Sequence, residues 1–444
     1  MSRAIPVLNF LENSGLLIGA AARYVPSDMH ESAASVSVSH GLPAPSGAED
    51  GGTLPPRLRE LCGAKILARA EALSAAIAVS QRTGRVLQAR HALELTLARL
   101  LECDRAPGNA AERRIIALAD GLAALHAALS GAGQARLEAA LDGALSGAES
   151  LVPLFHLVRC IEVQRSRGFT VHPAGLAEAA PFDLLLYRAD ERAELACETI
   201  SADDGRDLHR SAWFSLVDGI DPDLQTWLSA HPGRYLMKMT LPNGLRQTPD
   251  SSGLETLATL QRRIRDMLAA KRRADHDEAA VIRLDPLLLA GAQAGELGLM
   301  DALREQFGPE AQLAVTRSGS GVFVMAARAG RENHIGAAVR RRLEAAAPTR
   351  FTGANPGIVA IFLEDTNRTE WRSLRDSLHL EGEVRQFLTC PQAAPLAAVT
   401  AATRMEMLDP AAADSAPEGE LRFRNPSHKA AKSVALAPAI RSCG

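Results

Sequence analysis

The chain has 444 residues, of which 47% are hydrophobic, 23% are charged and 4% are aromatic, and its formal net charge is −3. This apolar fraction is enough for a folded core, so the composition excludes a wholly disordered chain. The length suggests two or three domains or one elaborated domain. The small net charge argues against a globally basic nucleic-acid binder and leaves open a local basic patch.

The N-terminal segment, residues 1–56, is expected to contribute little ordered structure. Its apolar stretch, 16–22, is too short for a membrane span and follows Glu12 and Asn13 instead of a basic region. Residues 23–56 are rich in Ser, Pro, Gly and Ala without a sustained period, which is typical of a partly disordered linker. We therefore expect neither a signal peptide nor a membrane helix here, and no association with a membrane.

Residues 57–150 carry the spacing of amphipathic helices. Apolar residues three and four positions apart recur in four stretches: 66–77, 93–100, 115–129 and 137–145. Each set places its apolar side chains on one helical face, which predicts a small helical bundle. We expect this bundle to serve packing or self-association.

From residue 151 the pattern changes to short strands between helices. Helices are predicted at 153–167, 203–218 and 254–273, and strands at 169–172, 182–187, 194–200 and 235–241. Region 151–278 is therefore predicted to be a helix-flanked mixed sheet, and the fold class to be α/β (mixed α+β) with an N-terminal helical bundle.

Region 279–408 continues in the same style as a C-terminal α/β extension. Strands are predicted at 279–284, 312–316, 322–327, 357–363, 384–388 and 397–401, and helices at 298–307, 332–346 and 369–378. The tail, 409–444, is rich in Ala, Pro and Ser and is expected to be mobile.

The six cysteines argue against a disulfide scaffold. They stand at positions 62, 103, 160, 197, 390 and 443, with no Cys-x-x-Cys pair and no histidine at zinc-finger spacing. We therefore expect no structural zinc site. Such sparse cysteines are typical of a reducing compartment, which predicts a cytoplasmic protein.

Three carboxylates in the predicted sheet region suggest a metal site. Glu162 lies on the first helix, Asp183 opens the second strand and Glu198 lies in the third. Carboxylates on a rigid sheet are the ligands that Mg²⁺ prefers, and such an ion can activate water and stabilise charge during phosphodiester cleavage.

This arrangement resembles the PD-(D/E)XK nuclease superfamily, whose core runs helix, three strands, helix, strand. Pro181-Phe182-Asp183 loosely matches the Pro-Asp element, and Glu198-Thr199-Ile200 falls where the Glu-x-Lys triplet belongs. The match covers 151–245 only. The resemblance implies a restriction-endonuclease-like fold, with Asp183 and Glu198 as Mg²⁺ ligands and Glu162 as the helix acid of some members.

The sequence departs from the superfamily at the catalytic lysine. The position of that lysine holds Ile200, and the chain has only five lysines in total. Lys238 is the only lysine between residues 66 and 270. Because the fourth strand of the superfamily lies beside the third, the resemblance makes Lys238 the candidate catalytic lysine, acting beside Glu198. An outward-facing Lys238 is the alternative, since charged residues are rarely fully buried.

A basic helix is the second candidate site. Six basic residues lie on one predicted helix: Arg262, Arg263, Arg265, Lys271, Arg272 and Arg273. Such a surface suits a nucleic-acid backbone, and a solvated face making ion pairs with nearby acids is the alternative. The sequence thus leaves two hypotheses open: a Mg²⁺-dependent nuclease, or a catalytically inactive nuclease-like binding or scaffold protein.

Overall fold

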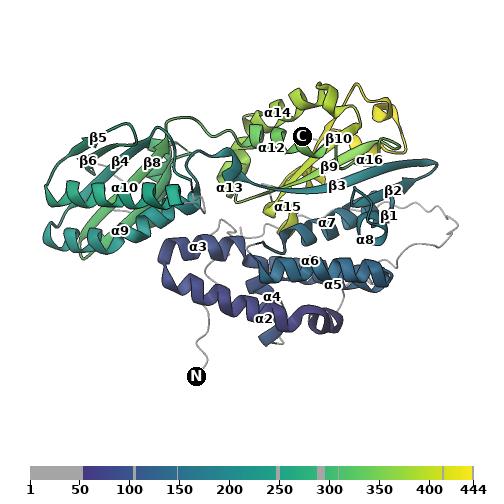
Figure 1. The fold of residues 1–444 in the computed structure, drawn as a ribbon, viewed down its shortest axis with the longest axis horizontal. Helices are drawn as coiled ribbons and strands as arrows, with labels where there is room; N and C mark the ends of the chain where they lie inside the picture. The colour runs from purple at the N-terminus through teal and green to yellow at the C-terminus, as the bar shows by residue number, and fades with distance from the viewer. Residues whose placement is uncertain are drawn as a thin grey trace, which may run out of the picture.

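The computed structural model describes residues 54–442 except 104–106, 148, 247–250, 288–295, 309 and 413–414. Apart from 54–56, the predicted segment 1–56 lies outside the described residues. The described part is a mixed α/β fold with 15 α-helices and two open mixed sheets (Figure 1). No helix within it is both long and apolar enough to cross a membrane.

The predicted helical bundle is present, and it does not stand apart from the rest. Its members are α2 (Pro56–Val79), α3 (Gln81–Arg90), α4 (Ala92–Cys103), α5 (Ala110–Ala128) and α6 (Gly131–Ser146). Asn109 caps α5 by accepting a hydrogen bond from the Glu112 N–H at 2.8 Å. The apolar stripes of the bundle join one continuous core with α7 (Val152–Ser166) and one face of the first sheet. The bundle therefore forms one layer of the unit that is built around the first sheet.

The first sheet has six strands in the order β1-β2-β3-β9-β10-β11. Their bounds are β1 (Thr170–His172), β2 (Leu184–Arg188), β3 (Glu191–Ser201), β9 (Gly357–Glu364), β10 (Leu396–Thr403) and β11 (Leu421–Arg424). β3, β9 and β10 are parallel, and the remaining neighbours pair antiparallel. The central β9 is buried on both faces, so its sequence is a continuous apolar run.

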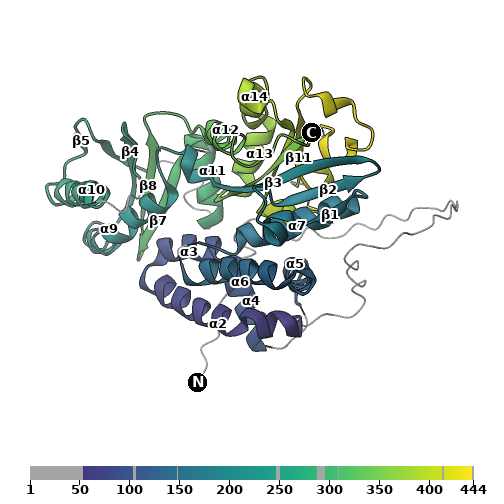
Figure 2. The ribbon, with the colours of Figure 1, turned by 45° about the vertical axis from the view of Figure 1, so that its right-hand side comes forward.

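Helices cover both faces of this sheet. α7 packs on one face, joined at the edge by the short α8 (Ala174–Glu178). The other face packs against α12 (Ile335–Ala346), α13 (Arg368–Asp376) and α14 (His379–Leu388) in a second core (Figure 2). Alternate residues of β3 consequently face different helices, which places Cys197 toward α7 and Glu198 toward α12.

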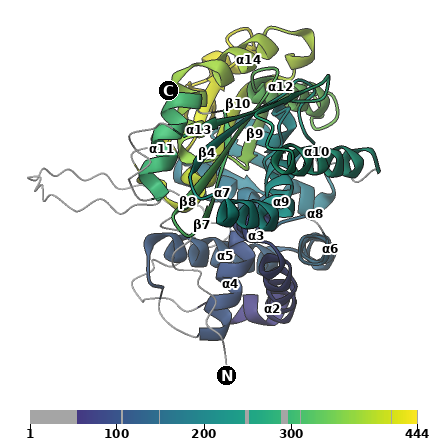
Figure 3. The ribbon, with the colours of Figure 1, turned by 90° about the vertical axis from the view of Figure 1, so that its left-hand side faces the viewer.

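The second sheet has five strands in the order β5-β6-β4-β8-β7. Their bounds are β4 (Arg234–Leu241), β5 (Ala274–His276), β6 (Val281–Pro286), β7 (Gln312–Ser318) and β8 (Gly321–Ala329). α9 (Arg210–Ala230) and α10 (Ser251–Ala269) lie on one face, and α11 (Glu296–Phe307) lies on the other (Figure 3). β7 and β8, which correspond to the strands predicted at 312–316 and 322–327, form an antiparallel hairpin with Gly319 at φ 56° in its turn.

The second sheet is an insertion between two strands of the first. β3 precedes all its strands in sequence, and β9, the parallel neighbour of β3, follows all of them. The predicted boundary at residue 278 therefore falls inside the second sheet, because β4 pairs with β6 and β8 across it. The region 279–408 does not form one extension: its first half completes the second sheet and its second half the first.

Local predictions differ from the structure in three places. The helix predicted at 203–218 is a 3₁₀ turn at Ala202–Gly205 followed by α9, which begins at Arg210. The strand predicted at 384–388 is wrong, because these residues end the helix α14. The tail expected to be mobile contains β11, which pairs with β10, and α16 (Ala437–Ile440).

A largely buried arginine, Arg82, joins the helical bundle to the inserted unit, which consists of the second sheet and its helices. Arg82 lies in the first turn of α3. Its guanidinium contacts Asp221 at 2.8 Å and the Val315 carbonyl at 2.8 Å. Its backbone N–H also donates to the Asp218 carboxylate at 3.1 Å. The bundle thus contacts both sheet units, as its place beneath them in Figure 1 shows.

Cys62 in α2 provides a test of the bundle core. Its side chain is buried, and burial raises the pKa of the Cys62 thiol from 9.0 to about 11. A group with a raised folded pKa stabilises the fold fully below its unfolded value and loses that contribution as pH rises through the folded value. We therefore expect the stability difference between the wild type and Cys62→Ala to narrow between about pH 9 and 11, measured by urea unfolding. Cys103→Ala, which alters an exposed thiol, should show no such pH-dependent change.

Candidate functional site: paired acids, arginines and a buried His-Cys-Cys cluster

The two acids expected to form the metal site lie close together on the first sheet. Asp183 directly precedes β2, and its Oδ2 accepts the Cys197 N–H at 2.7 Å. Glu198 lies within β3, with a side chain that is only 7% exposed. The antiparallel pairing of β2 with β3 brings these positions to the same part of the sheet, so the predicted juxtaposition of Asp183 and Glu198 is present.

Two arginines form ion pairs with these carboxylates. Arg350 bridges them, with Nη2 at 2.5 Å from Asp183 Oδ2 and Nε at 3.3 Å from Glu198 Oε1. Arg342, on α12, places Nε at 2.7 Å and Nη2 at 2.6 Å from Glu198 Oε2. Both Glu198 oxygens therefore face guanidinium groups. We call these four residues the acid–arginine cluster.

A third acid on the same strand face extends this arrangement. Glu194 is 1% exposed and accepts hydrogen bonds from the Thr352 N–H at 2.8 Å and Asn355 Nδ2 at 3.1 Å. The Thr352 hydroxyl donates to it as well. The segment from α12 to β9 is thereby held along β3. The i, i+4 spacing of Glu194 and Glu198 in a strand was the sequence signal that could have placed both on one face.

The acid–arginine cluster does not fit a Mg²⁺ ion as it stands. Mg²⁺ requires direct carboxylate oxygens at about 2.0–2.1 Å in octahedral geometry. Here both oxygens of Glu198 and Oδ2 of Asp183 lie 2.5 to 3.3 Å from guanidinium nitrogens. A divalent cation at the same oxygens would be repelled by two fixed positive charges. The donor set is that of a structural ion-pair network.

The other two predicted catalytic residues lie elsewhere. Glu162 is on α7, across the sheet from Glu198, and pairs with Arg114 of α5 at 2.7 Å. Lys238 is in β4 of the second sheet, where it pairs with Asp285 at 3.0 Å and is 42% exposed. The expectation that its strand lies beside β3 is wrong, because β9 takes that place. Ile200, at the lysine position of the motif, is buried in the core with α12.

The predicted nucleic-acid-binding helix is α10 with the turn that follows it. Three of its six basic residues pair with acids of the same unit: Arg263 with Asp275 at 3.0 Å and Asp277 at 2.6 Å, Arg265 with Asp223 at 2.6 Å, and Arg272 with Asp275 at 3.7 Å. Arg262, Lys271 and Arg273 are exposed. Nucleic-acid binding through this helix stays a prediction.

A cluster of two buried residues, His156 and Cys160, and the half-buried Cys197 lies on the opposite face of β3 from Glu198. His156 and Cys160 are four residues apart on α7, and each is at most 2% exposed. One ligand atom from each of the three residues lies within 4.8 Å of the other two. The prediction that the chain has no zinc site was based on zinc-finger spacings alone. It left out the spacing His-x-x-x-Cys, which places both side chains on one helical face.

The cluster is electrostatically coupled. A hydrogen bond from Cys197, together with nearby His156, holds the pKa of the Cys160 thiol well below its usual value, against the effect of burial. The same hydrogen bond and burial raise the pKa of Cys197. Burial alone lowers the pKa of His156, but the charge and hydrogen bond of Cys160 outweigh it, so the net direction is upward.

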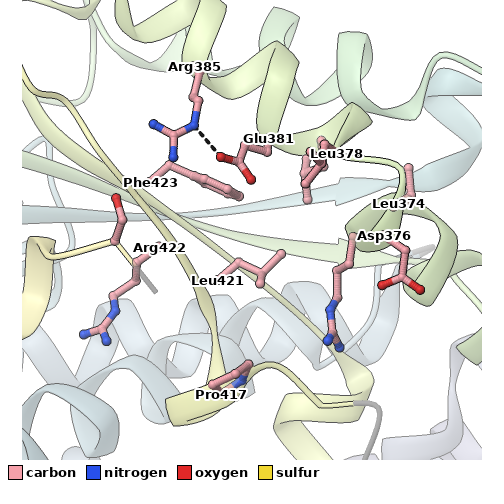
Figure 4. A pocket seen from close by; sticks show the side chains of 12 residues that line it. Leu374, Asp376, Leu378, Glu381, Arg385, Pro417, Leu421, Arg422 and Phe423 are labelled. Atoms are coloured by element: carbon pink, nitrogen blue, oxygen red, sulfur yellow. Dashed lines mark hydrogen bonds and ion pairs between the residues drawn. The ribbon is translucent and has the colours of Figure 1, made fainter. Parts of the chain in front are cut away.

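A cavity of about 570 Å³ lies at the other edge of the first sheet. Its walls come from α13, α14 and β11, and combine Leu378 and Phe423 with Arg385 and Arg422 (Figure 4). Arg385 is held by Glu381 of its own helix at 2.5 Å. Because β9 and β10 separate β11 from β3, this cavity does not adjoin the acid–arginine cluster.

No protein-family model, curated protein or solved structure matches this chain. Functional inference therefore rests on the residues and contacts described above.

Proposed function

We propose that this chain is a catalytically inactive, PD-(D/E)XK nuclease-like protein that acts as a binding or scaffold protein. The path of the first sheet supports this kind of fold. With the inserted unit and the short helix α8 between β1 and β2 set aside, α7, β1, β2, β3, α12 and β9 follow the order helix, three strands, helix, strand. β9 also lies beside β3 and parallel to it, as the fourth strand of the superfamily does.

The observation that carries the proposed loss of catalysis is the pairing of Glu198 and Asp183 with Arg342 and Arg350. A metal-dependent nuclease needs these oxygens for its ion. Here both arginines come from α12 and the segment after it, which also holds Glu194. At the position where the resemblance implies a metal ion, the arginines instead make contacts that fix the α12–β9 connection on the sheet.

The same fold has the form expected of a scaffold. The first sheet carries the helical bundle on its α7 face and the inserted unit between β3 and β9. Arg82 ties the bundle to the inserted unit through Asp218 and Asp221. Nucleic acid as a partner, self-association through 57–150 and a cytoplasmic location stay predictions.

The proposal predicts that the full-length protein neither cleaves nucleic acid nor binds Mg²⁺ at the acid–arginine cluster. DNA and RNA, single- and double-stranded, should remain intact with Mg²⁺ or Mn²⁺, at rates no higher than those of Glu198→Ala. Millimolar Mg²⁺ should leave the melting temperature of the wild type unchanged. Metal-dependent cleavage that Glu198→Ala abolishes would instead establish the nuclease hypothesis.

A double variant makes this test sharper. Arg342→Gln/Arg350→Gln frees the two carboxylates, so it should melt at a lower temperature and regain stability when Mg²⁺ neutralises them. Adding Glu198→Ala should remove that Mg²⁺-dependent gain. If Mg²⁺ stabilises the wild type as strongly as the double variant, the arginines do not block the ion and the proposal fails.

A further inference from the structure

We propose that His156, Cys160 and Cys197 bind a zinc ion between α7 and β3. The site is independent of the proposed function, because it lies on the other face of β3 from Glu198. Its donor set of one imidazole and two thiolates is one that Zn²⁺ takes in proteins and that Mg²⁺ does not.

The spacing of the donor atoms is close to that of a zinc site. With Zn–S of about 2.3 Å and Zn–N of about 2.0 Å, tetrahedral ligands stand about 3.5 Å apart for S and N and about 3.8 Å apart for two S atoms. Cys160 Sγ lies 3.8 Å from both ring nitrogens of His156, and the three ligand atoms span no more than 4.8 Å. A bound ion would therefore need to draw the donor atoms only slightly closer together.

The surroundings of His156 match those of a metal-binding histidine. Its Nε2–H donates to the Ala360 carbonyl of β9 at 3.0 Å. That hydrogen bond leaves the lone pair on Nδ1, the nitrogen available to an ion. Ligating histidines commonly donate their other ring N–H to a backbone carbonyl in this way, because it sets the tautomer and the ring orientation.

Charge balance also favours a thiophilic ion at this depth. Two thiolates and one Zn²⁺ sum to zero, so the loaded site avoids the cost of burying a net charge. As the two Zn–S bonds form, the two thiol protons pass to solvent. The described residues supply no fourth His, Cys or carboxylate to the set, so the fourth position is open to a water molecule.

The site connects the sheet to the helix through both neighbours of β3. Cys160 and His156 belong to α7, Cys197 to β3, and the Ala360 carbonyl to β9, which pairs with Cys197. Cys197 also donates its N–H to Asp183. A bound ion would therefore clamp α7 to the centre of the first sheet and stabilise the folded chain.

The test uses the full-length protein, kept reduced and exchanged against Zn²⁺. We expect about one zinc per chain by elemental analysis, a higher melting temperature with Zn²⁺, and sulfur-to-metal charge-transfer absorption when Co²⁺ replaces Zn²⁺. Cys160→Ser/Cys197→Ser should lose all three. Cys103→Ser/Cys390→Ser, which removes two thiols outside the cluster, should keep them.

The outcome does not depend on the folding of the double variant. If Cys160→Ser/Cys197→Ser fails to fold, the Co²⁺ spectrum of the wild type and its loss in His156→Gln provide the decision. Absence of zinc and of the Co²⁺ charge-transfer band in the folded wild type would overturn the proposal. So would loss of the band in Cys103→Ser/Cys390→Ser with retention in Cys160→Ser/Cys197→Ser.

Discussion

Replacing Arg206 with methionine should lower the free energy of unfolding by about 3–5 kcal/mol, because it removes the buried cation that pairs with the largely buried carboxylates of Asp203 and Glu370. The Arg206 side chain is completely buried. Its guanidinium contacts Asp203 Oδ1 at 2.5 Å, Glu370 Oε2 at 2.5 Å and the Asp365 carbonyl at 3.0 Å. Burial disfavours the charged form, yet Glu370 and Asp203 outweigh it and raise the pKa of Arg206.

The position of Arg206 explains why the loss should be large. The chain leaves the first sheet after β3 through this residue, and the returning chain hydrogen-bonds beside it, from the His334 N–H to the Gly205 carbonyl at 2.7 Å. Methionine keeps much of the side-chain volume, so the variant reports mainly on the lost charge and hydrogen bonds.

The measurement is urea unfolding followed by circular dichroism. Arg113→Met, which changes an exposed arginine on α5, is the matched control and should shift stability by no more than about 0.5 kcal/mol. An Arg206→Met effect as small as that of the control would show that the acids relax into water and that the network is not structural.

Glu406→Ala is the second change with a large expected effect, a loss of about 3 kcal/mol or more. Glu406 is 1% exposed and accepts four hydrogen bonds. The donors are Trp371 Nε1 at 2.9 Å, the Ala416 N–H at 2.8 Å, and the N–H and hydroxyl of Thr403, each at 2.7 Å. Alanine would leave these buried donors without an acceptor.

A second variant separates hydrogen bonding from cavity formation. Glu406→Gln has nearly the same size but only one acceptor oxygen, so it should fall between the wild type and Glu406→Ala. The control is Glu381→Ala, which removes one partner of an i, i+4 pair with Arg385 and should cost no more than about 0.5 kcal/mol. Thermal unfolding monitored by tryptophan fluorescence measures all three. Equal stability of Glu406→Gln and Glu406→Ala would argue against the hydrogen-bond explanation.

The two large predictions share a structural cause. Glu370 and Trp371 are neighbours on α13, and they bind Arg206 and Glu406 respectively. Both networks lie at the carboxyl ends of the parallel strands β3, β9 and β10, next to α13. They are buried polar groups whose partners come from distant parts of the chain, so the sequence pattern did not single out Arg206 or Glu406.

Helix and strand positions followed from local patterns where one face of an element is buried. The leucine spacing of the bundle is confirmed, and Leu118, Leu122 and Leu125 of α5 are buried as that spacing requires. Residues 384–388 were misread as a strand because they contain Val384 and Phe387. Their true period is helical, with Leu380, Val384 and Phe387 on one face of α14.

The candidate site was predictable only in part. The meander β1-β2-β3 is local, so the approach of Asp183 to Glu198 could be anticipated from adjacent strands. Arg342 and Arg350 come from beyond the inserted unit, and nothing in their local sequence indicates that they contact these acids. Lys238 was assigned to the wrong sheet for the same reason: a strand's sequence shows how buried it is but not which strand it pairs with.

By itself, the sequence determined the alternation of helices and strands, the mixed α/β class and the scarcity of lysine near Glu198. These properties depend on residue type and on periods of two or 3.6 residues, which act within a few turns of the chain. Only the tertiary structure decided that β9 lies beside β3 and that arginines pair with Asp183 and Glu198. It also decided that His156, Cys160 and Cys197 lie close together. Each of these depends on hydrogen bonds and packing between segments far apart in sequence, whose partners are selected by the whole fold.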